Sequence, residues 1–138
     1  NFFIFKLFEG TSWLCRFLVN VNNSAFFVGN SLVYRKDFKG VEAGLYRIVS
    51  ELIHNVKKHA HATEVFISLW EEKNTQTITL LVEDNGTGFI SNQSEGIGLK
   101  NIRYRVEYLG GKILIDSNTK GTSIVIEISG SKTPLHAQ

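Results

Sequence analysis

The chain has 138 residues and a formal net charge of +2, with 15 lysines and arginines spread along the sequence rather than gathered in a tract. This length suits one domain, and this charge pattern favours a phosphorylated small molecule over nucleic acid as a partner. Cys15 is the only cysteine, which excludes an internal disulfide and a cysteine-based zinc site and agrees with a reducing compartment.

Residues 1–10 fit no element and are expected to be a linker remnant or foreign sequence. Their apolar run, residues 2–8, is far shorter than the roughly 20 residues that cross a bilayer, so no membrane contact is expected from this chain. The chain begins at Asn1 and contains no methionine, and we therefore expect a piece of a longer protein.

Residues 11–130 are expected to form the domain, and residues 131–138 a loose tail. At its start, the apolar residues from Trp13 to Leu18 have a spacing that predicts a helix, with Thr11 or Ser12 as its N-cap. A turn at residues 20–24 and one or two strands across residues 25–34 are expected to follow.

From Val41 onward the pattern is clearer. Apolar residues at a 3.6-residue period predict an amphipathic helix of about four turns: Leu45, Ile48, Val49, Leu52, Ile53 and Val56. Alternating apolar residues over 65–69 and 78–82 then predict a hairpin.

The second half of the chain adds one helix and two strands. A glycine-containing polar loop over residues 85–96 precedes a second amphipathic helix, which is expected to end at Gly110 and Gly111. Strands are expected at residues 112–116 and 122–128. This order predicts an α+β fold, a two-layer sandwich in which helices lie on one face of a mixed, mostly antiparallel sheet.

The first strong helix carries polar residues on one stripe. Glu51, Asn55 and Lys58 are four and three residues apart, so a carboxylate, an amide and an ammonium share a face next to the apolar one. An Asn oxygen is a plausible Mg²⁺ ligand beside substrate phosphates, and a lysine can hold a phosphate. The alternative is an ordinary solvated helix face.

Two glycine motifs follow. Asp84 ends a strand directly before the sequence Asn-Gly-Thr-Gly-Phe, where a rigidly held acceptor can meet a flat ligand with an exocyclic amine. Gly96 and Gly98 open the second helix, whose free N–H groups favour phosphate oxygens. The alternatives are a plain turn and a flexible helix start.

None of the four histidines is expected to be a phosphorylated residue. His54 and His61 read as helix-surface residues and His136 as part of the tail, while His59 lies next to Lys58 and is a candidate phosphate contact. No pair has the spacing of a zinc protease site.

Taken together, the three segments resemble the ATP-binding domain of the GHKL or Bergerat type. This domain is shared by sensor histidine kinases, gyrase-type topoisomerases, the ninety-kilodalton chaperones and mismatch-repair ATPases. The resemblance covers about residues 42–129. Residues 45–60 and 98–106 look most like sensor kinases whose relatives respond to nitrate, envelope stress or membrane fluidity, and the short loop over residues 89–95 points to the nitrate-sensor-like subgroup.

The resemblance implies a role for each matching residue. Asn55 would bind Mg²⁺, Lys58 and His59 would meet the phosphates of ATP, and Asp84 would receive the adenine amino group. Thr122 matches a position that helps hold adenine through water, and Glu51 would be catalytic or would organise the metal. The residues that would shape the pocket around ATP are Gly86, Gly88, Gly96, Gly98 and Leu99.

The implied function is that of the catalytic domain of a sensor histidine kinase in two-component signalling. Its partners would be ATP, a dimerisation domain that carries the phosphoacceptor histidine, and a response regulator that acts through that domain. Residues 1–40 do not fit such a dimerisation segment, so the chain alone should not autophosphorylate. The domain would be cytoplasmic, in a parent protein attached to the inner membrane.

Two alternatives to this function stay open. One is an ATPase or serine kinase of the same superfamily, similar to the anti-sigma-factor kinases, in which Glu51 would be the base. The other is a nucleotide-binding interaction module.

Overall fold

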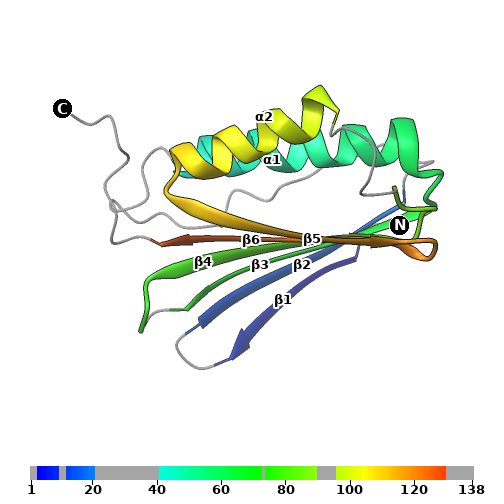
Figure 1. Cartoon of the computed structure of the whole chain (residues 1–138). Coiled ribbons are helices and arrows are strands. Elements are labelled where there is room, and N and C mark those ends of the chain that lie inside the picture. Colours follow the sequence, from blue (N-terminus) through cyan, green and yellow to red (C-terminus); the bar gives the residue numbers. More distant parts are fainter. Residues whose placement is uncertain (1–2, 10–11, 21–40, 73, 90–95, 130–138) are drawn as a thin grey trace.

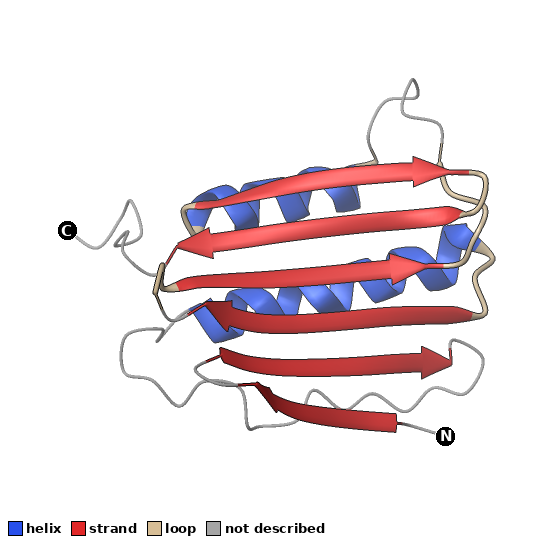
Figure 2. Cartoon of the chain, turned by 90° about the horizontal axis from the view of Figure 1, so that it is seen from below, coloured by secondary structure: helices blue, strands red, loops and turns tan. Residues whose placement is uncertain are grey.

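The computed structural model describes residues 3–9, 12–20, 41–72, 74–89 and 96–129, which form two layers (Figure 1). One layer is a six-stranded sheet, and the other consists of helices on one face of that sheet, which Figure 2 views from the opposite face. The predicted α+β sandwich is confirmed. Within the described residues, no helix combines the length and apolar character needed to cross a bilayer.

The helix layer contains two amphipathic helices that pack side by side. α1 (Val41–Asn55) continues into a five-residue π-helix, η2 (Val56–Ala60), and α2 (Ile97–Tyr108) contacts α1. All six residues of the predicted apolar period in α1 and η2 are buried, which confirms the amphipathic helix. α2 ends as predicted near Gly110, whose φ of +69° is left-handed and whose N–H binds the carbonyl of Glu107.

The sheet has the strand order β1-β2-β3-β4-β6-β5, and every described pair is antiparallel, although the sequence had suggested a mixed sheet. The predicted hairpin corresponds to β3 and β4, and the two predicted closing strands correspond to β5 and β6. The strand bounds are β1 (Phe3–Glu9), β2 (Ser12–Asn20), β3 (Glu64–Glu72), β4 (Thr77–Asp84), β5 (Gly111–Asn118) and β6 (Gly121–Ser129).

The predicted helix over Trp13 to Leu18 is wrong, because these residues belong to strand β2. β2 pairs with β3 from Trp13 opposite Glu71 to Asn20 opposite Glu64. The free edge of β3 offers these residues a continuous hydrogen-bonding partner, and this tertiary pairing outweighs a short helix-like spacing. Residues 3–9, which fitted no element, pair with β2 as the edge strand β1. The strands expected across residues 25–34 and the tail at 131–138 lie outside the described residues.

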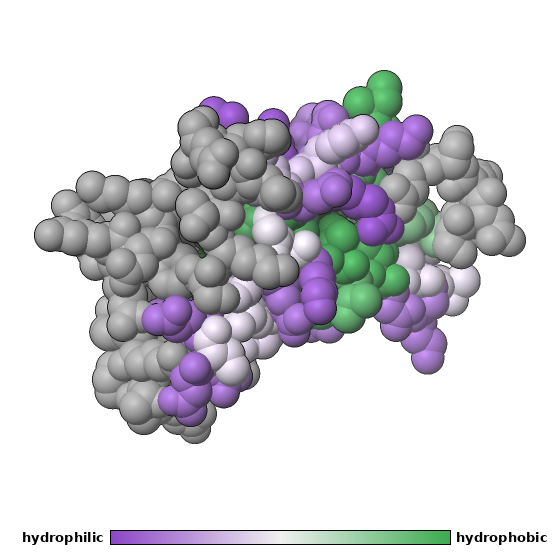
Figure 3. Space-filling model, turned by 60° about the vertical axis from the view of Figure 1, so that its left-hand side comes forward, coloured by the Kyte–Doolittle hydropathy of each residue, from purple (hydrophilic) through white to green (hydrophobic). Residues whose placement is uncertain are grey.

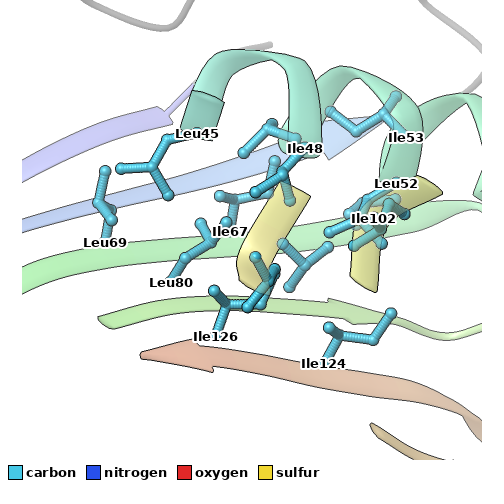
Figure 4. Packing of buried hydrophobic residues seen from close by; sticks show 14 of the residues in the cluster. Leu45, Ile48, Leu52, Ile53, Ile67, Leu69, Leu80, Ile102, Ile124 and Ile126 are labelled. Carbon is cyan, nitrogen blue, oxygen red and sulfur yellow. The ribbon is translucent and has the colours of Figure 1, made fainter. Parts of the chain in front are cut away.

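The core lies between the two layers. Figure 4 shows aliphatic side chains of α1 and α2 packed onto those of β3, β4 and β6. The largest side chains with less than 2% exposure are Ile48, Leu80, Ile102, Ile126, Ile128, Val65 and Val106. Burying one such side chain contributes about 1.5–3 kcal/mol relative to leaving it in water, so this cluster anchors the helices to the sheet.

The core is less completely covered at the outer strand β5. Ile113 and Ile115 are half-buried and pack against the core cluster, while Leu114 between them points to the opposite face and is 69% exposed. Figure 3 shows hydrophobic surface (green) framed by hydrophilic residues on the face turned forward there.

Candidate functional site

The predicted site residues gather at one end of the sandwich. β4 ends there at Asp84, the turn between β5 and β6 lies beside it, and η2 ends there at Ala60, as the right-hand end of Figure 1 shows. Segments that are far apart in the sequence therefore meet at this end.

Asp84 is held in place by the sheet and by the turn that follows it. It is the last residue of β4 and pairs with Val65 of β3 and with Thr122 of β6. Its Oδ1 atom accepts a 2.8 Å hydrogen bond from the backbone N–H of Gly86, which fixes the orientation of the half-buried carboxylate. Within the described residues Oδ2 has no hydrogen-bond donor, so this oxygen can accept a hydrogen bond from a ligand.

Asn85 has a structural role that the sequence did not single out. Its Oδ1 atom accepts hydrogen bonds of 3.0 Å from the backbone N–H groups of Thr63 and Glu64, and its Nδ2 donates to the Thr63 hydroxyl at 2.9 Å. These bonds tie the end of β4 to the start of β3. Asn after a strand and before glycine was a signal for such a turn.

Gly86 and Gly88 are required by close backbone approach. A Cβ on Gly86 would collide with the carbonyl of Ala60, which accepts a 2.8 Å hydrogen bond from Thr87 N–H. Gly88 has a φ of +65°, and a Cβ there would collide with the carbonyl of Asn118. The loop after Asp84 is therefore pressed between the end of η2 and the β5–β6 turn.

Thr122 lies opposite Asp84 on the neighbouring strand β6. It is 7% exposed, and its Oγ1 atom is 2.9 Å from the Oγ of Ser117 on β5. Ser117 Oγ also accepts a 2.9 Å hydrogen bond from the backbone N–H of Phe89. The sequence motifs did not point to Ser117, because only the pairing of β5 with β6 brings it opposite Thr122.

Glu51 and Asn55 meet at the start of α2. A Cβ built on Gly98 would lie 2.7 Å from Glu51 Oε1 and 3.1 Å from Asn55 Oδ1, so both oxygens converge on this glycine. Both side chains are half-buried, as the predicted position at the edge of the apolar face required. The absence of a side chain at Gly98 leaves these two hard oxygens next to the helix N-terminus.

Lys58 and His59 occupy the π-helical segment η2, and both are exposed. The sequence placed Lys58 on one α-helical stripe with Glu51 and Asn55, but the helix changes from α to π directly after Asn55. Because a π-helix closes its turns from residue i to i+5, Lys58 is turned away from an ideal α-helical position. π-helical turns occur frequently at functional sites.

The two remaining predicted pocket residues are in or before the first turn of α2. Gly96 is its N-cap in an extended conformation, and a Cβ there would meet nothing within 4 Å. Leu99 is half-buried. Gly96 therefore contributes no close approach of the kind seen at Gly98.

The histidines are spread over the described surface. His54 and His61 are exposed, and His61 is the C-cap of η2 with a left-handed φ of +51°, while His136 lies outside the described residues. The residues that the structure describes contain no group of three or more His, Cys, Asp or Glu side chains that could hold a metal ion.

The chain resembles known proteins over the same region. MctS, a sensor histidine kinase of Rhizobium johnstonii, is 36% identical over 86 residues, which cover 58% of this chain and 18% of MctS. DegS, a signal transduction histidine-protein kinase/phosphatase of Brevibacillus brevis, is 35% identical over 91 residues, which cover 64% of this chain and 23% of DegS. The chain thus spans less than a quarter of the length of these two relatives.

The structure is also similar to a solved structure of a histidine kinase. The blue-light activated histidine kinase of Erythrobacter litoralis EL346 aligns with a TM-score of 0.56 and 25% identity, covering 64% of this chain and 31% of that one. The family model for the histidine kinase-, DNA gyrase B- and HSP90-like ATPase matches residues 40–131, from the start of α1 past the end of β6. The chain belongs to the family of histidine kinase-, DNA gyrase B- and HSP90-like ATPases.

Proposed function

We propose that this chain is the ATP-binding catalytic domain of a sensor histidine kinase. It would transfer the γ-phosphate of ATP to a histidine on a separate dimerisation domain. The observation that carries the proposal is that polar groups suited to a base and oxygens suited to a metal ion lie at the same end of the sandwich. Asp84 and Thr122 are adjacent there on β4 and β6, and oxygens of Glu51 and Asn55 converge on Gly98.

The end of the site at β4 and β6 suits adenine. The free Oδ2 of Asp84 accepts a hydrogen bond from the exocyclic amine, and the hydroxyl of Thr122 lies next to it for a contact to the ring, directly or through water. Guanine has a carbonyl oxygen in place of that amine, which a carboxylate repels. This arrangement favours ATP over GTP.

The end of the site at α1 and α2 suits the phosphates. Mg²⁺ prefers a few hard oxygens and shares its shell with waters and substrate phosphates, and the Asn55 oxygen is its proposed protein ligand. Lys58 and His59, on the exposed side of η2, are the proposed phosphate contacts. The N-terminus of α2 beyond Gly96 and Gly98 offers backbone N–H groups to the same phosphates.

Catalysis would consist mainly of positioning and charge neutralisation. The bond between the γ-phosphorus and its bridging oxygen breaks, a bond to a histidine ring nitrogen forms, and ADP leaves. Glu51 Oε1 lies beside Gly98, as Asn55 Oδ1 does, so the proposed role of Glu51 is to orient the metal ligand or to accept a proton at the reacting end. A response regulator would then receive the phosphoryl group from the histidine.

The wider setting belongs to the same proposal. The domain would act in the cytoplasm, in a parent protein attached to the inner membrane. It would belong to the nitrate-sensor-like subgroup, and it would not phosphorylate itself. The similarity to MctS and DegS, both named as histidine kinases, supports a histidine kinase, while neither name supports the nitrate-sensor assignment.

A reconstituted phosphorylation assay tests the proposal. The chain is mixed with the dimerisation domain of its parent protein and with ATP labelled on the γ-phosphate, with and without Mg²⁺. We expect label on the dimerisation domain that is stable in base and lost in acid, as phosphohistidine is. Acid-stable label on serine, or phosphate release without labelled protein, would instead assign the chain to the serine kinases or ATPases of the family.

A further inference from the structure

Ser117 connects the adenine end of the site to the loop that follows Gly88. In the sheet register it is opposite Thr122, which is opposite Asp84, so three polar residues form a row across β5, β6 and β4. Ser117 Oγ is 2.9 Å from Thr122 Oγ1 and accepts the N–H of Phe89 at 2.9 Å. The serine hydroxyl is therefore held from two sides.

Either hydroxyl can donate in this pair, so a bound ligand that needs a donor would select the direction. A hydroxyl has one proton to donate, and the Phe89 N–H already occupies one acceptor position on Ser117. If Thr122 donates to Ser117, its only proton is used within the pair and Thr122 can only accept a hydrogen bond from a ligand. If Ser117 donates to Thr122, both of its contacts are satisfied and the Thr122 proton is left for a ligand.

We propose that Ser117 is a positioning residue that makes Thr122 a hydrogen-bond donor toward the nucleotide base. This inference rests on the proposed ATP-binding function and adds to it the residue that sets base specificity together with Asp84. Asp84 offers an acceptor and Thr122 a donor, side by side on adjacent strands. Adenine presents the complementary pair, because its amino group donates and the neighbouring ring nitrogen N1 accepts.

The test compares ATP with 1-deaza-ATP, in which a C–H replaces the acceptor N1. Binding to this chain is measured by calorimetry. The wild type should prefer ATP by roughly two- to tenfold, the value of one neutral hydrogen bond. Ser117→Ala should lose most of this preference, because no neighbouring donor then fixes the orientation of the Thr122 hydroxyl.

Two further variants at Ser117 and one control separate positioning from a loss of structure. Ser117→Thr keeps the hydroxyl and should retain the preference for ATP, while Ser117→Cys fills a similar space with a weak donor and should lose it. Ser123→Ala on β6 removes a hydroxyl one residue from Thr122 on the opposite face of the sheet and should bind both nucleotides like the wild type.

Coupling between the two hydroxyls gives a second readout. If Ser117 acts through Thr122, Ser117→Ala should add little to the loss of ATP affinity already caused by Thr122→Ala. Losses that multiply, or an unchanged preference for ATP over 1-deaza-ATP in both Ser117→Ala and Ser117→Cys, would overturn the inference. The proposed function fails in a different way, namely if the wild type does not bind ATP or if Asp84→Asn binds it normally.

Discussion

Replacing Asp84 by asparagine tests the adenine end of the site with little disturbance to the fold. The Oδ1 atom of Asp84 accepts the Gly86 N–H at 2.8 Å, and an asparagine can keep this bond with its own Oδ1. The turn is then preserved, and the change is confined to the second position. There the free carboxylate oxygen is replaced by an NH₂ group, which faces the adenine amine donor to donor.

The expected loss follows from the one bond that changes. A hydrogen bond to a charged group is worth about 1.5–3 kcal/mol, which corresponds to a loss of roughly 10- to 150-fold in ATP affinity. The loss should be the same with and without Mg²⁺, because the metal ligand is proposed at the other end of the site. Inosine triphosphate, whose base carries an oxygen in place of the amine, should bind the Asp84→Asn protein better than it binds the wild type.

Calorimetric titration with both nucleotides measures these effects. Glu83→Gln is a matched control, because Glu83 is the neighbouring exposed carboxylate on the opposite face of β4 and its loss changes the net charge equally. Glu83→Gln should bind ATP like the wild type. If Asp84→Asn does the same, or if it weakens ATP and inosine triphosphate equally, the assignment of Asp84 to the adenine amine is refuted.

Three further changes test the metal end, the loop and the core. Asn55→Ala should weaken ATP binding in Mg²⁺ and leave it unchanged in EDTA; an equal loss in both titrations would exclude Asn55 as a metal ligand. Gly86→Ala forces a Cβ onto a backbone carbonyl of η2 and should lower the free energy of unfolding by about 1–3 kcal/mol in urea denaturation. Gly96→Ala is the control, because a Cβ there would meet nothing within 4 Å, and it should leave this free energy unchanged. Equal stabilities of the two variants would contradict the close approach of Gly86 to η2. Leu80→Ala, at a position 1% exposed, should lower the free energy of unfolding by about 2–5 kcal/mol. Leu114→Ala, at a position 69% exposed, should change it by less than about 0.5 kcal/mol. Similar losses in the two variants would mean that Leu114 is covered.

Sequence patterns predicted the elements correctly where the local pattern agrees with the tertiary environment. α1 was predictable because its apolar period matches the face that packs on the sheet, and β3 and β4 because their alternating apolar residues belong to the core cluster beneath the helices. The segment from Trp13 to Leu18 was mispredicted because a short apolar run fits either structure, and the exposed edge of β3 decided in favour of a strand.

In the candidate site, too, some residues were predictable from the sequence and others only from the tertiary structure. Asp84, Glu51 and Asn55 could be selected from sequence, because their residue types and their places at the end of a strand and along a helix suit metal and nucleotide chemistry. Lys58 was selected with them, but the change from α to π helix after Asn55 was not visible in the sequence. Ser117 was missed, since a serine in a strand has no local signal and gains its meaning from a neighbour on another strand.

The sequence by itself determined the element order of residues 41–129, the periods of their buried faces and the three motifs that identify the family. These properties depend on residues close together in the chain, whose spacing sets which side of a helix or strand they occupy. The tertiary structure alone decided that Ser117, Thr122 and Asp84 form one row and that Glu51 and Asn55 converge on Gly98. The reason is physical: strand register and helix packing are set by the burial of the whole core and not by the local sequence.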